Sequence, residues 1–68
     1  MGYRVREIRE QQKMTQEELE RRSGVSRQTI SAIENEKVKA EDVKVGTLLA
    51  LASALQTTID CLFFDKAV

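Results

Sequence analysis

The chain has 68 residues, of which 41% are hydrophobic and 32% are charged, and its eleven basic side chains balance eleven acidic ones. This length allows one domain with a small core, and the lack of histidine together with a single cysteine excludes an internal disulfide, a cysteine-based zinc site and histidine acid–base chemistry. No apolar run approaches the roughly 20 residues that a membrane span needs. We therefore expect a cytoplasmic protein that contacts no membrane, is not an enzyme and needs no cofactor, metal or small-molecule ligand.

The first part of the chain predicts two short helices. Apolar residues at helical spacing favour a first helix over about residues 3–12. Thr15 followed by Glu18 has the spacing of a capping box, which predicts a second helix over about residues 16–22. Gly24 is well placed to end this helix in a left-handed conformation.

Three further helices are predicted after this glycine. Ser26 is a good cap for a third helix that runs to about Asn35. The charged stretch 36–44 has no apolar periodicity and is expected to be a loop, whereas the leucines of 46–55 recur at helical spacing. Thr58 can cap a short fifth helix, in which one of the adjacent residues Phe63 and Phe64 enters the core.

The outward face of the third helix carries side chains suited to DNA bases. Ile30 and Ile33 define its buried direction, and Gln28, Ala32 and Asn35 lie nearly opposite. Two helices joined by a short turn that contains glycine fit a helix-turn-helix over about residues 15–35. In that motif the second helix enters the major groove, where arginine matches guanine, glutamine matches adenine and a methyl group meets thymine.

The segment MTQEELERRSGVSRQTISAIENEK, residues 14–37, resembles the core motif of the Cro/CI-type, or XRE, family of helix-turn-helix regulators. The similarity extends to RVREIRE before it and to TLLALASAL and TTIDCLF after it. The resemblance implies an all-α, compact five-helix bundle, a lambda-repressor-like DNA-binding domain that occupies residues 1–68 as a single unit. It also implies a sequence-specific regulator that binds double-stranded DNA as a homodimer on a palindromic operator, with the recognition helix, about 26–35, in the major groove.

The resemblance assigns roles to individual residues. Base readers are Arg27, Gln28 and Ala32, and Ala32 stays open between a thymine-methyl contact and simple helix propensity. Phosphate or edge contacts are Gln16, Ser26, Thr29, Ser31, Asn35 and Lys37, while Lys39 stays open between a phosphate contact and a solubilising charge. A structural ion pair joins Arg9 to Glu34. Arg4 and Arg6 are expected to be surface charges and not DNA ligands.

Two residues and one loop depart from the family pattern. The loop before the fourth helix is about three residues longer than in the family and lacks its usual proline. Glu20 stands where the family usually has alanine, and we expect its stem to lie along the surface with the carboxylate in solvent. Glu36 replaces a common glycine and brings negative charge near the phosphate path. Glu17, Glu18 and Glu20 point in different directions on one helix, so they are not expected to form a metal site.

The C-terminal segment suggests a partner surface. Cys61, Leu62 and Phe64 are expected to form the dimer interface, because exposed apolar residues in so small a protein indicate a partner. An alternative is a protein-interaction module on the same fold, which would bind a toxin or the transcription machinery through this segment. A random-library DNA selection separates the two, because an interaction module should enrich no motif.

Overall fold

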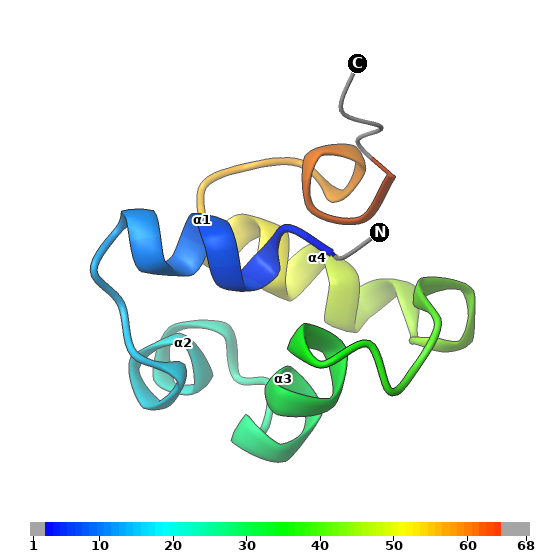
Figure 1. The fold of residues 1–68 in the computed structure, drawn as a ribbon, viewed down its shortest axis with the longest axis horizontal. Helices are drawn as coiled ribbons and strands as arrows, with labels where there is room; N and C mark the ends of the chain where they lie inside the picture. Colours follow the sequence, from blue (N-terminus) through cyan, green and yellow to red (C-terminus); the bar gives the residue numbers. More distant parts are fainter. Residues whose placement is uncertain (1–2, 65–68) are drawn as a thin grey trace.

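The computed structural model describes residues 3–64, and within that range every regular element is helical (Figure 1). The elements are α1 (Val5–Gln11), α2 (Gln16–Ser23), α3 (Arg27–Glu34), the 3-10 turn η1 (Ala40–Asp42), α4 (Val45–Ala54) and the π-helical turn η2 (Asp60–Phe64). The expected all-α fold is confirmed. The expected domain ends at residues 1 and 68 lie outside the described residues.

The helices are arranged so that α2 and α3 form one side of the molecule. Figure 1 shows α2 and α3 together at one edge, α1 and α4 across the middle, and η2 at the opposite edge. Helix α2 packs on both α3 and α4, and α1 packs on both α3 and η2. The helix pair that matches the predicted motif is therefore supported from behind by the rest of the fold.

Aliphatic side chains from every helix fill the core. The fully buried large residues are Leu19, Ile30, Ile33, Leu51, Leu55, Leu62 and Val5. Burying a side chain of this size stabilises the fold by about 1.5–3 kcal/mol. On α4 the core takes Leu48 and Leu51 but leaves Leu49 54% exposed, because consecutive helical residues point in different directions.

Local capping signals begin α2 and α3 where the sequence predicts. Thr15 Oγ1 accepts a hydrogen bond from the Glu18 amide at 3.0 Å, and Ser26 Oγ accepts one from the Thr29 amide at 3.2 Å. Gly24 ends α2 with φ +76°. The Glu18 side chain does not return to the cap but pairs with Arg22 at 2.8 Å.

The N-terminal segment is tied to the long loop. The expected first helix, about 3–12, is shorter in the structure, and Tyr3 precedes it. The Tyr3 hydroxyl accepts from the Ala40 amide at 2.7 Å and donates to the Val38 carbonyl at 3.2 Å. This contact helps fix the expected loop, which contains the turn η1 as well.

The C-terminal turn closes against the same N-terminal segment. The Arg4 amide donates to the Leu62 carbonyl at 2.8 Å, and the Tyr3 and Phe63 rings meet edge-on with centroids 5.2 Å apart. Leu62 is only 1% exposed, so its assignment to a dimer interface is wrong: its side chain fills the core of its own chain. Phe63 is buried and Phe64 is 51% exposed, as the alternation of neighbouring side chains requires.

Three helices end on a left-handed residue that is not glycine. These residues are Lys13 (φ +55°), Glu36 (φ +57°) and Gln56 (φ +57°). At the end of α3 the Lys37 amide donates to the Ala32 carbonyl at 2.9 Å and the Glu36 amide to the Ile33 carbonyl at 3.0 Å. These two bonds are the Schellman pattern, in which glycine is favoured at the left-handed position because it has no Cβ.

We predict that Glu36→Gly stabilises the fold. Glycine removes the strain energy of the left-handed conformation, but it also raises the conformational entropy of the unfolded chain. The first effect is larger, so the free energy of unfolding should increase by about 1 kcal/mol. For a domain of this size the thermal midpoint should rise by about 4–8 °C. Glu36→Ala, which removes the same carboxylate but keeps Cβ, is the control in thermal unfolding. Equal midpoints for the two variants would contradict the strain explanation.

Candidate nucleic-acid interface

A carboxylate of α2 closes the turn between α2 and α3. Glu20 Oε2 accepts a hydrogen bond from the Arg27 amide at 2.9 Å. The first amides of a helix have no partner within the helix, and the helix dipole makes them attractive to an anion. The Glu20 carboxylate is at the surface, as expected, and it also caps α3 from across the turn.

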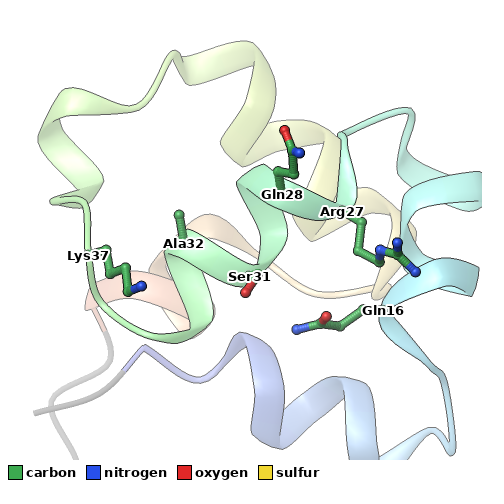
Figure 2. Close-up of a pocket in the computed structure, with 6 residues that line it drawn as sticks. All are labelled: Gln16, Arg27, Gln28, Ser31, Ala32 and Lys37. Atoms are coloured by element: carbon green, nitrogen blue, oxygen red, sulfur yellow. The ribbon is translucent and has the colours of Figure 1, made fainter.

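Six side chains surround a shallow hollow on the outer side of this helix pair. The hollow has a volume of about 360 Å³ and is lined by Gln16, Arg27, Gln28, Ser31, Ala32 and Lys37. Arg27, Gln28, Ser31 and Ala32 belong to α3. Figure 2 shows Gln16 beside this helix and Lys37 beyond its end. The three expected base readers thus lie next to three of the expected phosphate contacts.

The other expected contacts are engaged within the protein. Ser26 Oγ donates to Thr29 Oγ1 at 2.9 Å, in addition to its cap bond, so these two hydroxyls serve the start of α3. Asn35 Oδ1 accepts from Arg6 Nη2 at 2.9 Å, and Asn35 Nδ2 donates to Ser31 Oγ at 3.2 Å. Ser26, Thr29 and Asn35 do not line the hollow.

The ion pair expected between α1 and α3 is present and buried. Arg9 Nε lies 2.7 Å from Glu34 Oε2, and Arg9 Nη2 lies 3.2 Å from Glu34 Oε1. Each residue is 8% exposed. Arg9 Nη1 also donates to the Met14 carbonyl at 2.6 Å, which fixes the chain just before α2. Two parallel bonds between planar groups define the angle between the helices more tightly than a single contact.

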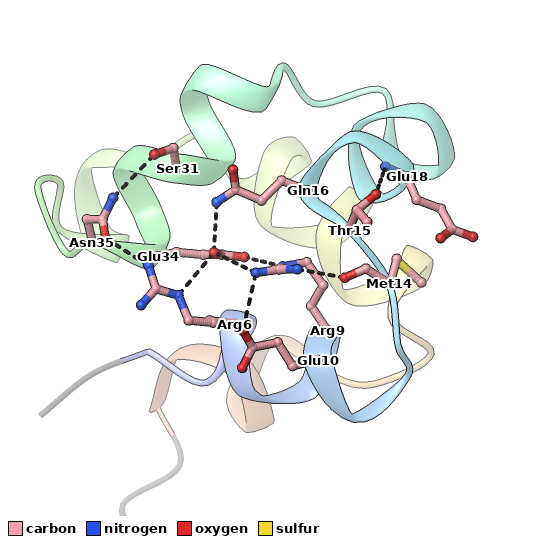
Figure 3. Close-up of polar contacts among 10 residues, drawn as sticks. All are labelled: Arg6, Arg9, Glu10, Met14, Thr15, Gln16, Glu18, Ser31, Glu34 and Asn35. Atoms are coloured by element: carbon pink, nitrogen blue, oxygen red, sulfur yellow. Dashed lines mark hydrogen bonds and ion pairs between the residues drawn. The ribbon is translucent and has the colours of Figure 1, made fainter.

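The same carboxylate collects two further donors. Figure 3 shows Gln16 and Arg6 converging with Arg9 on Glu34. Gln16 Nε2 lies 2.9 Å and Arg6 Nε 3.4 Å from Glu34 Oε1. Since Gln16 is the first residue of α2, this carboxylate joins three helices and holds one of the hollow's own side chains.

The ionisation of Glu34 reflects two opposing effects. Burial alone raises the pKa of this carboxyl, because it disfavours the charged form. Hydrogen bonds from Arg9 and Gln16, the positive charge of Arg9 and the hydrogen bond from Arg6 outweigh burial and hold the pKa of Glu34 below its ordinary value of 4.5. The carboxylate therefore stays charged in the folded protein at neutral pH.

Sequence reasoning missed the contributions of Arg6 and Glu20. Arg6 was expected to be a plain surface charge, yet it bonds to both Glu34 and Asn35. A signal for it existed, because residues three apart share a helix face, so a partner for Arg9 is also within reach of Arg6. Glu20 carried no comparable signal, since its partner is a backbone amide.

The chemistry of the hollow suits base edges more than a small molecule. Its lining offers a guanidinium, two amides, a hydroxyl, a methyl group and an ammonium group, with no carboxylate. These groups match the donor and acceptor patterns that base pairs present in the major groove. Elsewhere in the described range, no three acidic or cysteine side chains are grouped so that they could hold a metal ion.

Comparison with known proteins agrees with this geometry. The family model described as helix-turn-helix matches residues 5–60, which include every element from α1 to the start of η2. No curated protein matches the sequence significantly. In the part of the chain that the structure describes, no helix combines the length and the apolar character needed to cross a bilayer.

We predict that Glu34→Gln destabilises the fold by about 3–5 kcal/mol, because the buried Arg9 guanidinium keeps only the exposed Glu10 carboxylate, 4.0 Å away, as a counter-charge. Glu18→Gln removes the exposed pair with Arg22 and should cost less than about 1 kcal/mol. Denaturant unfolding measures both.

The same pair of proteins tests the effect of pH. Because the folded pKa of Glu34 lies below 4.5, its contribution to stability is present above that pH and is lost as the pH falls through the folded pKa. Glu34→Gln should therefore lose less stability than the wild-type protein on acidification. Parallel acid profiles for the two proteins would contradict this account.

Proposed function

Because this chain belongs to the Cro/CI-type, or XRE, family of helix-turn-helix DNA-binding regulators, we propose that it binds a specific double-stranded DNA sequence with α3 in the major groove. The main support for this proposal is the hollow. It is lined by the first residue of α2, by exposed residues of α3 and by Lys37. This proposal makes the chain a cytoplasmic transcriptional regulator.

Three residues of α3 read the bases in this proposal. Gln28 is exposed near the start of the helix and binds adenine through its amide, while Arg27 binds guanine through its guanidinium. Ala32 lies one turn after Gln28 and offers its methyl group to thymine. Each good bidentate contact contributes about 1–3 kcal/mol of discrimination against a wrong base.

The residues around this helix set its position on the DNA backbone. Lys37 is exposed just past the end of α3 and supplies a charge to a phosphate. Gln16 approaches the DNA with its amide nitrogen already bonded to Glu34. That bond orients the side chain before DNA arrives, so less side-chain freedom is lost on binding.

The proposed assembly is a two-fold dimer on a palindromic operator, with half-sites about 34 Å apart. Exposed apolar side chains remain on two elements: Val45 (64%) and Leu49 (54%) on α4, and Phe64 (51%) on η2, beside the half-buried Cys61. The run 45–59 contains no charged residue. A neutral surface favours contact with its own copy, because a two-fold axis places equivalent residues near each other.

A selection from a random DNA library tests the function directly. The purified protein should enrich one motif, and a dimer should enrich two inverted half-sites at a fixed spacing. A module that only binds other proteins would enrich none, which would refute the proposal.

We predict opposite signatures for Gln28→Ala and Lys37→Ala. Loss of the Gln28 amide should relax base preference at one position of each half-site and leave the salt dependence of binding nearly unchanged. Loss of the Lys37 charge should weaken all sequences alike and make the log–log salt slope shallower by about 0.9 per phosphate contact. Binding to matched and single-mismatch duplexes at several salt concentrations separates the two effects. Full discrimination by Gln28→Ala would exclude this side chain as a reader.

We predict that Leu49→Glu and Phe64→Glu weaken self-association, since each places a charge on the exposed apolar surface. Gln11→Glu adds the same charge at an exposed position of α1 and is the control. Sedimentation equilibrium at tens of micromolar protein should give a dimer for the wild-type protein and the control, and lighter species for the other two. A wild-type protein that stays monomeric both alone and on its selected DNA would contradict the dimer.

A further inference from the structure

Hydrogen bonds link three side chains in series from α1 to the side of α3 that is proposed to face DNA. Arg6 Nη2 donates to Asn35 Oδ1 at 2.9 Å, and Asn35 Nδ2 donates to Ser31 Oγ at 3.2 Å (Figure 3). Ser31 is the member that lines the hollow. We propose that Arg6 is a positioning residue for DNA recognition, which acts through Asn35 to set the hydroxyl of Ser31. This inference rests on the proposed function.

The direction of the hydrogen bonds follows from the chemistry of the first donor. A guanidinium only donates, so the end of the Asn35 amide that faces Arg6 must be its oxygen. The amide nitrogen is then the end that faces Ser31. Without Arg6, neither of the other two side chains in this series would fix which end of the amide faces Ser31. Asn35 could then present either its oxygen or its nitrogen to that hydroxyl.

This direction decides what Ser31 can offer to DNA. A serine hydroxyl has one proton to donate and two lone pairs that accept. Because Ser31 Oγ accepts from Asn35, and donates to no acceptor within residues 3–64, its proton is left for a partner across the hollow. Phosphate oxygens and the acceptors of base edges are such partners. A reversed Asn35 amide would take this proton for itself.

Arg6 is itself held in place from the core. Its Nε lies 3.4 Å from Glu34 Oε1, the oxygen that also accepts from Arg9 and Gln16. The Arg6 side chain is nevertheless 50% exposed, so it makes this connection at the surface. The buried carboxylate thus orients Arg6, which orients the Asn35 amide, which orients the hydroxyl.

A double-mutant cycle on operator binding tests the inference with Arg6→Met, Ser31→Ala and the combined variant. Arg6→Met should weaken binding to the selected operator about three- to tenfold, the effect of losing one or two hydrogen bonds. In the Ser31→Ala background the same substitution should have almost no further effect, because the hydroxyl it positions is gone. Arg22→Met, which removes another exposed arginine of an ion pair, should leave operator binding unchanged.

The opposite result would identify a direct electrostatic role for Arg6. In that case Arg6→Met would weaken binding equally with and without Ser31, Arg6→Lys would restore it, and the salt slope would fall by about 0.9. That outcome would overturn the inference while leaving the proposed function intact. Thermal unfolding of each variant shows whether a loss of binding comes from a loss of folded protein.

A second measurement reports the chain of contacts without DNA. In nuclear magnetic resonance spectra of the free protein, the Asn35 side-chain amide signals should shift in both Arg6→Met and Ser31→Ala, and should stay unchanged in Arg22→Met. Unshifted signals would overturn the inference whatever the DNA results. If the wild-type protein selects no DNA sequence, the proposed function fails and the DNA role of Arg6 fails with it, whereas the amide signals still report the contacts themselves.

Discussion

The buried carboxylate of Glu34 is the interaction on which the remaining structure depends. Its two oxygens accept from Arg9 on α1, from Gln16 on α2 and from Arg6 on α1, while Glu34 itself ends α3. A charge removed from water is costly unless its hydrogen bonds are complete, and here several donors meet it. An arrangement of these helices that left the carboxylate short of donors would carry that cost. The relative placement of α1, α2 and α3 is specified by this requirement as well as by aliphatic packing.

The same group connects the core to the outer side of the helix pair. Gln16 and Arg6 lie at the surface, and both donate hydrogen bonds to Glu34, Gln16 from Nε2 and Arg6 from Nε. Among the side chains that line the hollow, Gln16 therefore has less freedom than its exposure alone would indicate. Glu20 acts similarly at the other end of α3, where its carboxylate fixes the first helical amide. Helix α3 is thus held at both ends by carboxylates, Glu20 at its start and Glu34 at its end.

Local signals predicted the elements, whereas contacts between distant segments decided the details. Thr15, Gly24 and Ser26 each act on backbone within a few residues, so their roles were readable from the sequence. The pairing of Arg9 with Glu34 came from the family resemblance. Leu62 lies at helical spacing from Ile59, which indicates a buried face, but this pattern does not show whether the face packs on its own chain or on a partner. The hydrogen bond to Glu20 could not be predicted either, because its donor is a backbone amide, which almost every residue type has.

The contacts between the two ends of the described chain bear on how the protein folds as it is made. Tyr3 packs on Phe63, and the Arg4 amide bonds to the Leu62 carbonyl. These pairs are almost as far apart in sequence as the described range allows, and closing so long a loop is slow compared with forming helices. On the ribosome, α1 to α3 can pack as they emerge, but the start of α1 stays open until η2 has left the exit tunnel. The helix that supplies Arg6 and Arg9 is thus synthesised before the other described helices and is among the last of them to be fully enclosed.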